Sequence, residues 1–512
     1  MKKILLTVSL FIITICITAQ PIEWQKCLGG TNSDWAESIQ HTTDGGYVVA
    51  GTSESIDGDV TGNHGYTDCW VVKLTSLGAI DWQKSLGGAN FDQATSIQQT
   101  TDGGYIVAGY SESTDGDVTG NHGNYDYWVV KLDSTGTITW QKSLGGNGDD
   151  EAYYIQQTSD GGYIVAGMSE SVDGDVTSNH GYRDFWVVKL DSIGGIDWQK
   201  CLGGTVGDGA NSIQQTTDGG YIVAGHSNST DGDVTGNHGS WDYWVVKLTS
   251  TGTIEWQKSL GGTGGDAAFS IQLTADGGYI VAGYSNSTDG DVTGNHGSRD
   301  YWVVKLDSLG AIDWQKSLGG TGIDEPCSIQ QTTDGGYVVA GLSWSTDGDV
   351  IGTYNYGLTD YWVVKLDSSG TIDWQKSLGG WDGDDAYSIQ QTADGGYIVA
   401  GRSNSNSGNV TGNHGANDSW VVKLSPTVGV DEITKQKMFS VYPNPASNQI
   451  TIKATAKLVG AAYTVFDNMG KMVLSGQLKT ENTVIELGNL SDGIYLFSIG
   501  ENNKQTFKVI KE

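Results

Sequence analysis

Basic residues, proline and cysteine are scarce in this chain of 512 residues. Only 28 lysines and arginines stand against 60 aspartates and glutamates, which gives a formal net charge of -32. Such a surface repels a phosphate backbone, so the charge balance excludes nucleic acid as a partner. No run after the first 19 residues is apolar enough to cross a bilayer, so we expect no transmembrane span. With 5 prolines beside 76 glycines, 18 tryptophans and 24 tyrosines, the composition favours short strands and tight turns.

The five cysteines are not spaced as in a disulfide framework. Cys27, Cys69, Cys201 and Cys327 each replace a serine, a tyrosine or a similar residue in single copies of a repeat. Positions that vary independently are not planned pairs, so we expect free, packed thiols. The fifth, Cys16, follows the large Ile15, which disfavours a lipoprotein because a small residue normally precedes a lipidated cysteine.

The N-terminus has the order of a secretory signal peptide. Two lysines precede an apolar run from Ile4 to Ile17, and Thr-Ala follows before Gln20. This run is too short to span a membrane, so residues 1–19 are predicted to be removed during export.

A unit of 58 residues recurs along the chain, with one spacing of 60, and each unit contains four short apolar segments. In the second copy we expect strands at Ser96–Thr100, Gly104–Gly109, Tyr127–Leu132 and Ile138–Leu144. Segments rich in Val, Ile, Tyr and Trp without simple alternation are typical of strands buried on both faces. Seven Asp-Gly-Gly turns give seven units: Asp44, Asp102, Asp160, Asp218, Asp276, Asp334 and Asp394. Four strands per unit describe the blade of a β-propeller.

The units at the two ends of the array are incomplete, and each has the strand that the other lacks. Ile22–Leu28 matches the fourth strand of a unit that has no other part, while the last unit stops at its third strand, 418–424. Pairing these two segments removes both exposed edges, so the sequence predicts a ring closed by the N-terminal strand. The alternative is an open solenoid, which would need capped ends. Fourteen of the 18 tryptophans fall at two repeat positions, where we expect them to pack blade against blade.

The units resemble the repeats of secreted bacterial β-propeller proteins, and more distantly kelch repeats, through the Gly-Gly-Tyr strand and the later tryptophan. The resemblance covers Pro21 to Ser425. It implies the fold and says almost nothing about activity.

The C-terminal segment is a different module. After a polar linker at 426–437, short strands alternate with Asn-Pro, Met-Gly and Asp-Gly turns, which predicts a small Ig-like β-sandwich at 438–512. Tyr442-Pro-Asn-Pro445, Asp492-Gly-Ile-Tyr495 and a basic last strand closely resemble the C-terminal sorting domain of the type IX secretion system. The resemblance implies export across an outer membrane to the cell surface, with the secretion machinery as a partner. An ordinary Ig-like binding domain is the alternative.

The long loop between the second and third strands contains a spacing typical of calcium loops. Acidic, Thr and Gly residues occupy positions 1, 3, 5, 6 and 12, as in an EF-hand loop, although position 12 is Asp and strands flank the loop. The candidate ligands lie in blades 1, 2, 4 and 5: Asp57, Asp59, Thr61, Asp68, Asp115, Asp117, Thr119, Asp126, Asp231, Asp233, Thr235, Asp242, Asp289, Asp291, Thr293 and Asp300. The alternative is turn chemistry, because Asp caps turns through nearby backbone groups.

Other residue types in these loops do not form a catalytic pattern. One histidine recurs in each of several loops, such as His64, which suits loop packing better than a shared metal site. The sequence shows no Ser-His-Asp order and no phosphate loop. Carboxylates could form a hydrolytic pair at Asp149–Glu151 or Asp382–Asp385, but seven near-copies give little of the asymmetry that a glycosidase needs. We therefore expect no enzyme.

Aromatic residues break the symmetry of the repeat on the face that carries the long loops. Exposed aromatics on an acidic rim suit stacking on sugar rings or gripping a protein, although each could also fill a local gap. The candidate ligand-binding residues, mainly in neighbouring blades 6, 7 and 1, are Trp35, Trp344, Tyr354, Tyr356, Trp381, Trp241 and Arg402.

Together these features predict an all-β protein: a signal peptide (1–19), a seven-bladed propeller (20–425), a linker (426–437) and a sorting domain (438–512). We expect a surface binding or adhesion module that recognises a glycan or a protein. The alternatives are an extracellular polysaccharide-active enzyme and a purely structural surface protein.

Overall fold

The computed structural model of the protein describes residues 20–350, 358–426, 439–443, 445–454, 458–467, 471–499 and 505–512. The predicted signal peptide, most of the predicted linker, Tyr354 and Tyr356 lie outside these residues. Two compact units divide the chain, Met1–Thr427 and Val428–Glu512. The described part of the chain contains no helix that is long and apolar enough to cross a membrane.

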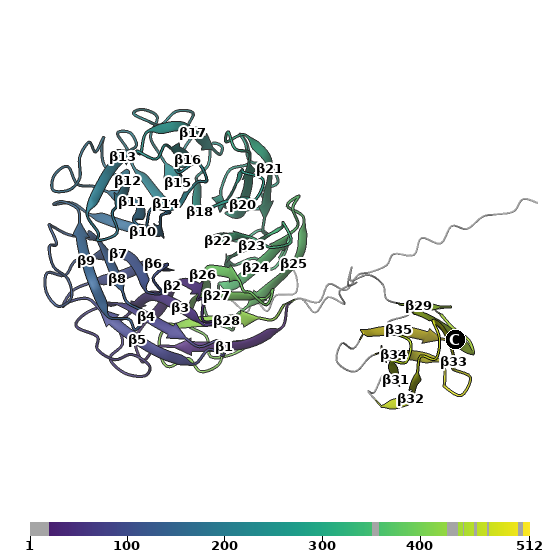
Figure 1. The fold of residues 1–512 in the computed structure, drawn as a ribbon. Helices are drawn as coiled ribbons and strands as arrows, with labels where there is room; N and C mark the ends of the chain where they lie inside the picture. The colour runs from purple at the N-terminus through teal and green to yellow at the C-terminus, as the bar shows by residue number, and fades with distance from the viewer. Residues whose placement is uncertain are drawn as a thin grey trace, which may run out of the picture. The chain divides into compact units, whose positions relative to one another are not determined.

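Seven four-stranded antiparallel sheets form the described part of the first unit and are arranged as blades around a central channel (Figure 1). The first strands, which line the channel, are β2 (Asp34–His41), β6 (Asp92–Gln99), β10 (Asp150–Gln157), β14 (Asp208–Gln215), β18 (Asp266–Leu273), β22 (Asp324–Gln331) and β26 (Asp384–Gln391). The second strands are β3 (Tyr47–Ser53), β7 (Tyr105–Ser111), β11 (Tyr163–Ser169), β15 (Tyr221–Ser227), β19 (Tyr279–Ser285), β23 (Tyr337–Ser343) and β27 (Tyr397–Ser403). These sheets confirm the predicted propeller fold.

The third strands are β4 (Asp68–Leu74), β8 (Asp126–Leu132), β12 (Asp184–Leu190), β16 (Asp242–Leu248), β20 (Asp300–Leu306), β24 (Asp360–Leu366) and β28 (Asp418–Leu424). The outer strands are β5 (Ile80–Leu86), β9 (Ile138–Leu144), β13 (Ile196–Leu202), β17 (Ile254–Leu260), β21 (Ile312–Leu318), β25 (Ile372–Leu378) and β1 (Ile22–Leu28). Second and third strands are buried along almost their whole length, whereas the outer strands are partly exposed.

The last blade is built from both ends of the repeat array. β1 pairs antiparallel with β28, from Ile22 opposite Leu424 to Leu28 opposite Ser419. Figure 1 shows the purple β1 beside the green β28. The Trp420 indole donates a hydrogen bond of 2.8 Å to Gln25, as the third-strand tryptophan of the other blades does to its own outer strand. The pairing therefore covers edges that both end strands would otherwise expose.

Aromatic side chains join each blade to the next. Tyr127 of blade 2 lies 4.5 Å from Trp186 of blade 3, measured between ring centroids, and its hydroxyl donates to the Trp186 carbonyl. Trp24 on β1 meets Tyr47 of blade 1 edge to face at 5.7 Å. Such pairs contribute about 0.5–1.5 kcal/mol beyond their burial. The tryptophans at the two repeat positions thus pack between blades, as the sequence predicts.

Tight turns end the strands on the face opposite the long loops. Gly45 has a φ of 84°, which the Asp-Gly-Gly turn requires. Asp44 accepts a hydrogen bond from the Gly46 amide and forms an ion pair of 2.8 Å with buried Lys73. The turn is thereby fixed to the third strand of its own blade.

The predicted first strand begins too late in every blade. In blade 2 the prediction starts at Ser96, whereas β6 starts at Asp92. The four extra residues include a β-bulge, because the register between β6 and β7 shifts between Ala94 and Ser96. A bulge interrupts the apolar pattern from which strands are recognised.

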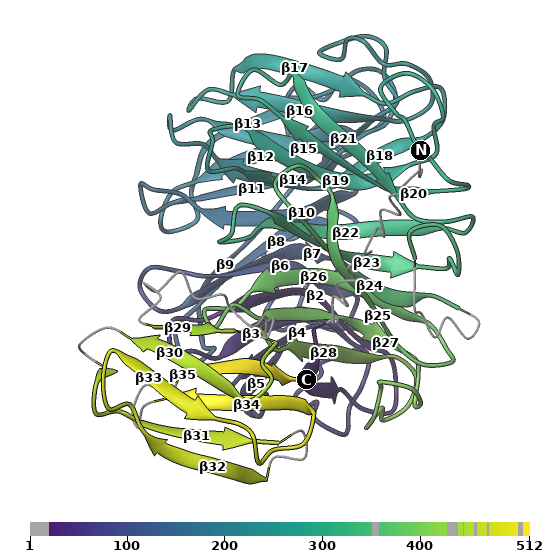
Figure 2. The ribbon, with the colours of Figure 1, turned by 90° about the vertical axis from the view of Figure 1, so that its right-hand side faces the viewer.

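The second unit consists of two facing sheets, ordered β29-β30-β33 and β32-β31-β34-β35 (Figure 2). Its strands are β29 (Phe439–Tyr442), β30 (Gln449–Ala454), β31 (Ala462–Phe466), β32 (Met472–Gln477), β33 (Asn482–Glu486), β34 (Gly493–Ile499) and β35 (Gln505–Lys511). Ile450, Val465, Phe497 and Val509 form its core between the sheets.

Candidate functional site

The seven repeats are nearly identical except at a few positions, and one of these is the bulged residue of each first strand. The register shift recurs at this place in all seven blades. The bulged residues are Glu37, Thr95, Tyr153, Asn211, Phe269, Cys327 and Tyr387. A bulged residue leaves the ladder of paired residues and can be aimed away from the sheet. One of the most variable positions of the repeat is therefore also one that the backbone frees from pairing.

These bulged residues meet at the mouth of the central channel. All seven line one cavity of about 290 Å³, together with Gln93, Tyr154 and the serines that follow most of the bulges. The first strands enter the channel from the long-loop face, because the loops between blades lie there beside the long loops. The cavity, which we call the channel-mouth cavity, thus opens on the face where the sequence predicts the ligand.

Below this cavity the channel is lined by residues that hardly vary. A second cavity of about 130 Å³ is surrounded by the repeated Ser, Ile and Gln residues. Gln40 accepts a hydrogen bond from the Gln99 amide of the next blade, and Ser38 accepts one of 3.4 Å from Ile97. Equivalent bonds join the other blades around the ring. Constancy at these positions follows from their role in joining blades.

Matched pairs of variable residues face each other across the first and second strands, and one of these residues, Gln93, lines the channel-mouth cavity. Opposite Gln93 stands Tyr110, whose hydroxyl donates to the Gln93 side chain at 2.9 Å. Asp385 and Arg402 face each other and form an ion pair of 2.6 Å. Across from His226 the residue is glycine, and a Cβ at that position would lie 3.1 Å from the imidazole. The variable residues therefore complement one another in blades 2, 4 and 7.

The residue immediately before each third strand is also variable, and in several blades it contacts the variable residue of the second strand. Tyr125 packs on Tyr110 with ring centroids 5.3 Å apart. Trp241 lies 5.0 Å from the His226 ring. Arg299 stands 4.3 Å above the Tyr284 ring. Variable residues thus form one connected surface around the cavity.

Glu37 is the one carboxylate among the described residues that line the channel-mouth cavity. Burial raises the pKa of Glu37 to about 7, although the charge of Arg402 and a hydrogen bond from Trp35 act in the opposite direction. The side chain therefore changes charge near neutral pH. Burial also raises the pKa of the neighbouring Tyr387, and the charges of Asp385 and Glu37 add to this effect.

The predicted ligand-binding residues separate into two groups. Trp35 and Arg402 lie on the first and second strands, in the wall behind Glu37. Trp344 is 50% exposed, and Trp381 is 65% exposed on the loop that leads into blade 7. Trp241 is 41% exposed and packs on His226. Neither Trp344 nor Trp381 lines the channel-mouth cavity.

The predicted calcium ligands of blade 1 each have a partner of their own. Asp57 accepts from the Thr31 amide at 2.8 Å, and Asp59 accepts from Gly29 at 3.4 Å. Thr61 accepts a hydrogen bond from Gln83, and Asp68 is bound by His64. The same bonds recur in blades 2, 4 and 5.

These bonds support the turn role of the loop residues. The described residues include no group of three or more His, Cys, Asp or Glu side chains that could hold a metal ion. Calcium binding stays a prediction, to be tested in solution.

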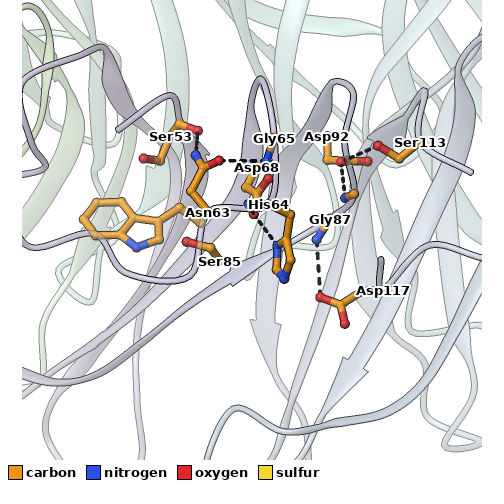
Figure 3. A network of polar contacts seen from close by, with 12 residues as sticks. Ser53, Asn63, His64, Gly65, Asp68, Ser85, Gly87, Asp92, Ser113 and Asp117 are labelled. Atoms are coloured by element: carbon orange, nitrogen blue, oxygen red, sulfur yellow. Dashed lines mark hydrogen bonds and ion pairs between the residues drawn. The ribbon is translucent and has the colours of Figure 1, made fainter. Parts of the chain in front are cut away.

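The loop histidines bind the aspartate that begins the third strand (Figure 3). In blade 1, His64 directs both its amide (3.0 Å) and Nδ1 (2.7 Å) at buried Asp68. Asp92 of the next blade accepts from the Gly88 amide and from Ser113. Each blade junction thus contains two buried carboxylates, and burial raises the pKa of both Asp68 and Asp92, the latter to about 6.

Four of the acidic groups predicted as possible catalytic pairs have partners of their own. Glu151 accepts a hydrogen bond of 2.5 Å from Tyr153, and Asp385 is paired with Arg402. Asp150 and Asp384 are the buried carboxylates of their blade junctions, bonded to Ser171 and Ser405.

Sequence reasoning missed the bulged residues as candidate site residues. Their signal is present in the sequence, because aligning the seven copies shows that this column varies between two constant segments. Its meaning was hidden by the late start assigned to the first strand.

Comparison with known proteins identifies the C-terminal unit. Residues 440–512 match the family described as secretion system C-terminal sorting domain. The chain is therefore a secreted β-propeller protein that carries a type IX sorting domain and is attached to the cell surface. This confirms the predicted resemblance, the localisation and the secretion machinery as a partner.

The propeller has more distant similarities. The regulatory protein FlaEY of Caulobacter vibrioides is 25% identical over 409 residues, which cover 70% of this chain and 42% of that protein. PorZ, a surface component of the type IX secretion system of Porphyromonas gingivalis, is 12% identical with a TM-score of 0.44, over 96% of this chain and 61% of that one. The Pan2 WD40 domain of Neurospora crassa is 11% identical with a TM-score of 0.43, over 78% and 95%. This chain thus spans less than two thirds of FlaEY and of PorZ.

Proposed function

We propose that the protein is a binding module of the cell surface that holds its ligand in the channel-mouth cavity. The observation that carries this proposal is the position of the sequence variation. The bulged residue is among the positions at which the seven copies differ most, and all seven bulged residues line one cavity. Selective variation around a cavity on a rigid scaffold is typical of recognition.

The constant positions support the same reading. Residues that join blades, such as Gln40 and Trp70, repeat because the same contact is made seven times. The bulged residues share no single packing contact: Thr95 and Asn211 donate to backbone carbonyls of the next blade, whereas Tyr153 donates to Glu151 of its own blade. Variation at that position therefore changes the cavity directly.

Binding accounts for the site better than hydrolysis. A glycosidase needs one protonated and one free carboxylate on either side of the bond that it cleaves. Glu151, Asp385, Asp150 and Asp384 are instead bonded to Tyr153, Arg402 and the serines of the blade junctions. A purely structural role would leave the variation at the cavity without a cause.

The test compares two pairs of variants of the purified protein containing both units. Phe269→Ala and Tyr387→Ala change the cavity, whereas Trp344→Ala and Trp381→Ala change exposed loop residues outside it. We expect the cavity variants to lose binding to a glycan array and to extracted surface proteins by more than tenfold, and the loop variants to keep it. Unchanged melting temperatures serve as the folding control. Equal binding by all four variants would refute the proposal, and so would release of product from a polysaccharide.

A further inference from the structure

The lining of the channel-mouth cavity is aromatic and polar but carries little charge. Its aromatic side chains are Tyr153, Tyr154, Phe269 and Tyr387, contributed by blades 3, 5 and 7. Uncharged hydrogen-bonding groups come from Gln93, Thr95, Asn211 and a set of serines: Ser38, Ser96, Ser212, Ser270, Ser328 and Ser388. Flat apolar faces therefore alternate with amide and hydroxyl groups around one small volume.

No lysine or arginine is among the described residues that line this cavity. The arginines of the surrounding layer are already paired: Arg183 with Glu170, Arg299 with Glu325 and Arg402 with Asp385. A carboxylate, sulfate or phosphate on a ligand would meet Glu37 and find no free cation. Because desolvating an unpaired charge is costly, anionic ligands are disfavoured.

The size and depth of the cavity limit how much of a ligand can enter. Its volume of about 290 Å³ lies at the lower end of the range of ligand pockets, about 300–1,000 Å³. Beneath it the channel is lined by the constant Ser, Ile and Gln residues, whose hydrogen bonds between blades hold the first strands together. A chain of several rings would have to remain outside, among the long loops.

Resting on the function proposed above, we infer that the cavity binds the uncharged terminal sugar ring of a glycan, which enters end-on from the long-loop face. A pyranose has apolar C–H faces that pack on aromatic rings and hydroxyl groups around its edge that bond to amides and hydroxyls. The cavity presents both kinds of partner. The remainder of the glycan extends outward from the cavity on the long-loop face.

The probes for the test are four sets of oligosaccharides of equal length. One set ends in glucose, galactose or mannose, one in a uronic acid, one in a sulfated sugar and one in glucosamine with a free amine. We expect the purified protein to bind a member of the neutral set at least tenfold more tightly than its uronic acid counterpart. Phe269→Ala removes an aromatic face and is expected to weaken this binding more than tenfold.

A charge variant separates neutral sugars from amines. Glu37→Gln keeps the shape of the side chain and a hydrogen-bonding group, so binding of a neutral sugar should change less than threefold and remain flat from pH 6 to 8. A primary amine would instead bind through the Glu37 carboxylate, lose more than tenfold in this variant and weaken as the pH falls.

The outcomes distinguish the two proposals. Preference for the amine or the anionic set, with loss in Phe269→Ala, would overturn the neutral-sugar inference and leave the binding site in place. If the protein bound only surface proteins and the cavity variants lost that binding, the neutral-sugar inference would be wrong and the binding site would still stand. Binding that no cavity substitution alters would overturn both.

Discussion

Asp360 and Asp126 occupy equivalent positions at two blade junctions but have different neighbours. His122 bonds to Asp126 through its amide and Nδ1, whereas the residue four positions before Asp360 is tyrosine. Burial and the charge of Asp384 raise the pKa of Asp360 to about 8. Burial also raises that of Asp126, with His122 acting against it, to about 6. The two residues therefore form a matched pair for substitution.

Asp360→Asn is expected to stabilise the propeller at pH 7.5 by about 1 kcal/mol, because burial beside Asp384 forces the carboxyl to take up a proton on folding and asparagine needs none. Asp126→Asn is expected to destabilise it by about 1–2 kcal/mol, because the bonds from His122 then go to a neutral acceptor. Urea unfolding followed by tryptophan fluorescence measures both. At pH 5 the effect of Asp360→Asn should be smaller, because the unfolded carboxyl is then closer to its own pKa and binding the proton costs less. Equal effects of the two substitutions would contradict this account.

The buried carboxylates also predict the pH dependence of stability. Asp92, Asp126 and Asp384 have their pKa raised to about 6, and Asp360 to about 8. A group with a raised pKa in the folded state binds more protons there than in the unfolded state, so stability falls as the pH rises through that range. We therefore expect the melting temperature to increase from pH 8 to pH 5, as measured by circular dichroism. Burial lowers the pKa of His226 to about 4, so this residue binds fewer protons in the folded state and has the opposite effect. It is one group against several.

Below about pH 4 a second set of residues reverses the trend. Burial alone would raise the pKa of Asp102, but hydrogen bonds from Thr100 and Lys131 lower it to about 2. Stabilisation by such ion pairs is lost as the pH falls towards that value. A melting temperature that decreased steadily from pH 8 to 5 would contradict the assignment of the buried pairs.

The predicted calcium loops can be tested by the effect of calcium on thermal stability. Because Asp57, Asp59 and Asp68 each accept hydrogen bonds from different partners, removing calcium should leave the melting temperature unchanged. The measurement is thermal unfolding with and without a chelator. A fall on chelation, reversed by added calcium and not by magnesium, would establish a calcium site, since a ligand of the folded state raises its stability.

At the scale of elements, the N-terminal strand of the propeller completes the last blade. β1 supplies the fourth strand beside β28, and Trp24 on it packs against Tyr47 of blade 1. Deleting residues 20–28 should therefore expose an edge and a core surface together, lower the melting temperature and cause aggregation.

A rearranged chain gives the matched control for this deletion. In it the chain begins at Thr31 and carries Ile22–Gly30 after Leu424, joined by the Asp133–Thr137 turn. This order reproduces the connection between the third and fourth strands of blade 2. We expect a monomer in gel filtration with nearly the original melting temperature. A rearranged chain as unstable as the deletion would show that the covalent order of β1 matters more than its pairing.

At the scale of the whole molecule, the C-terminal unit determines where the propeller acts. Residues 440–512 match a secretion system sorting domain. Removing them should leave the propeller folded but inside the cell, as shown by protection from protease added to intact cells. The Phe269→Ala variant, which alters only the cavity, is expected to reach the surface in normal amount. Surface display without the domain would mean that another signal directs export.

The sequence by itself determined the period, the number of blades and the sorting domain. Each depends on local pattern: apolar segments, Asp-Gly-Gly turns and a few ordered motifs that repeat or end the chain. Burial of Trp70 and its equivalents also followed, because one side chain recurring in seven copies must make the same contact seven times. The exposed Trp344 and Trp381 were recognised as departures from the repeat, although neither lines the cavity.

Only the tertiary structure decided which variable residues meet. The bulge at Glu37 and its equivalents depends on how two strands pair, and no local signal fixes that register. Their convergence needs the ring itself, which brings residues as far apart as Glu37 and Tyr387 to one cavity. Likewise the loop aspartates have a calcium-like spacing, but their hydrogen-bond partners come from the neighbouring blade loop, which spacing along the chain cannot reveal. Contacts between segments far apart in the sequence thus determined the roles of the bulged residues and of the loop aspartates.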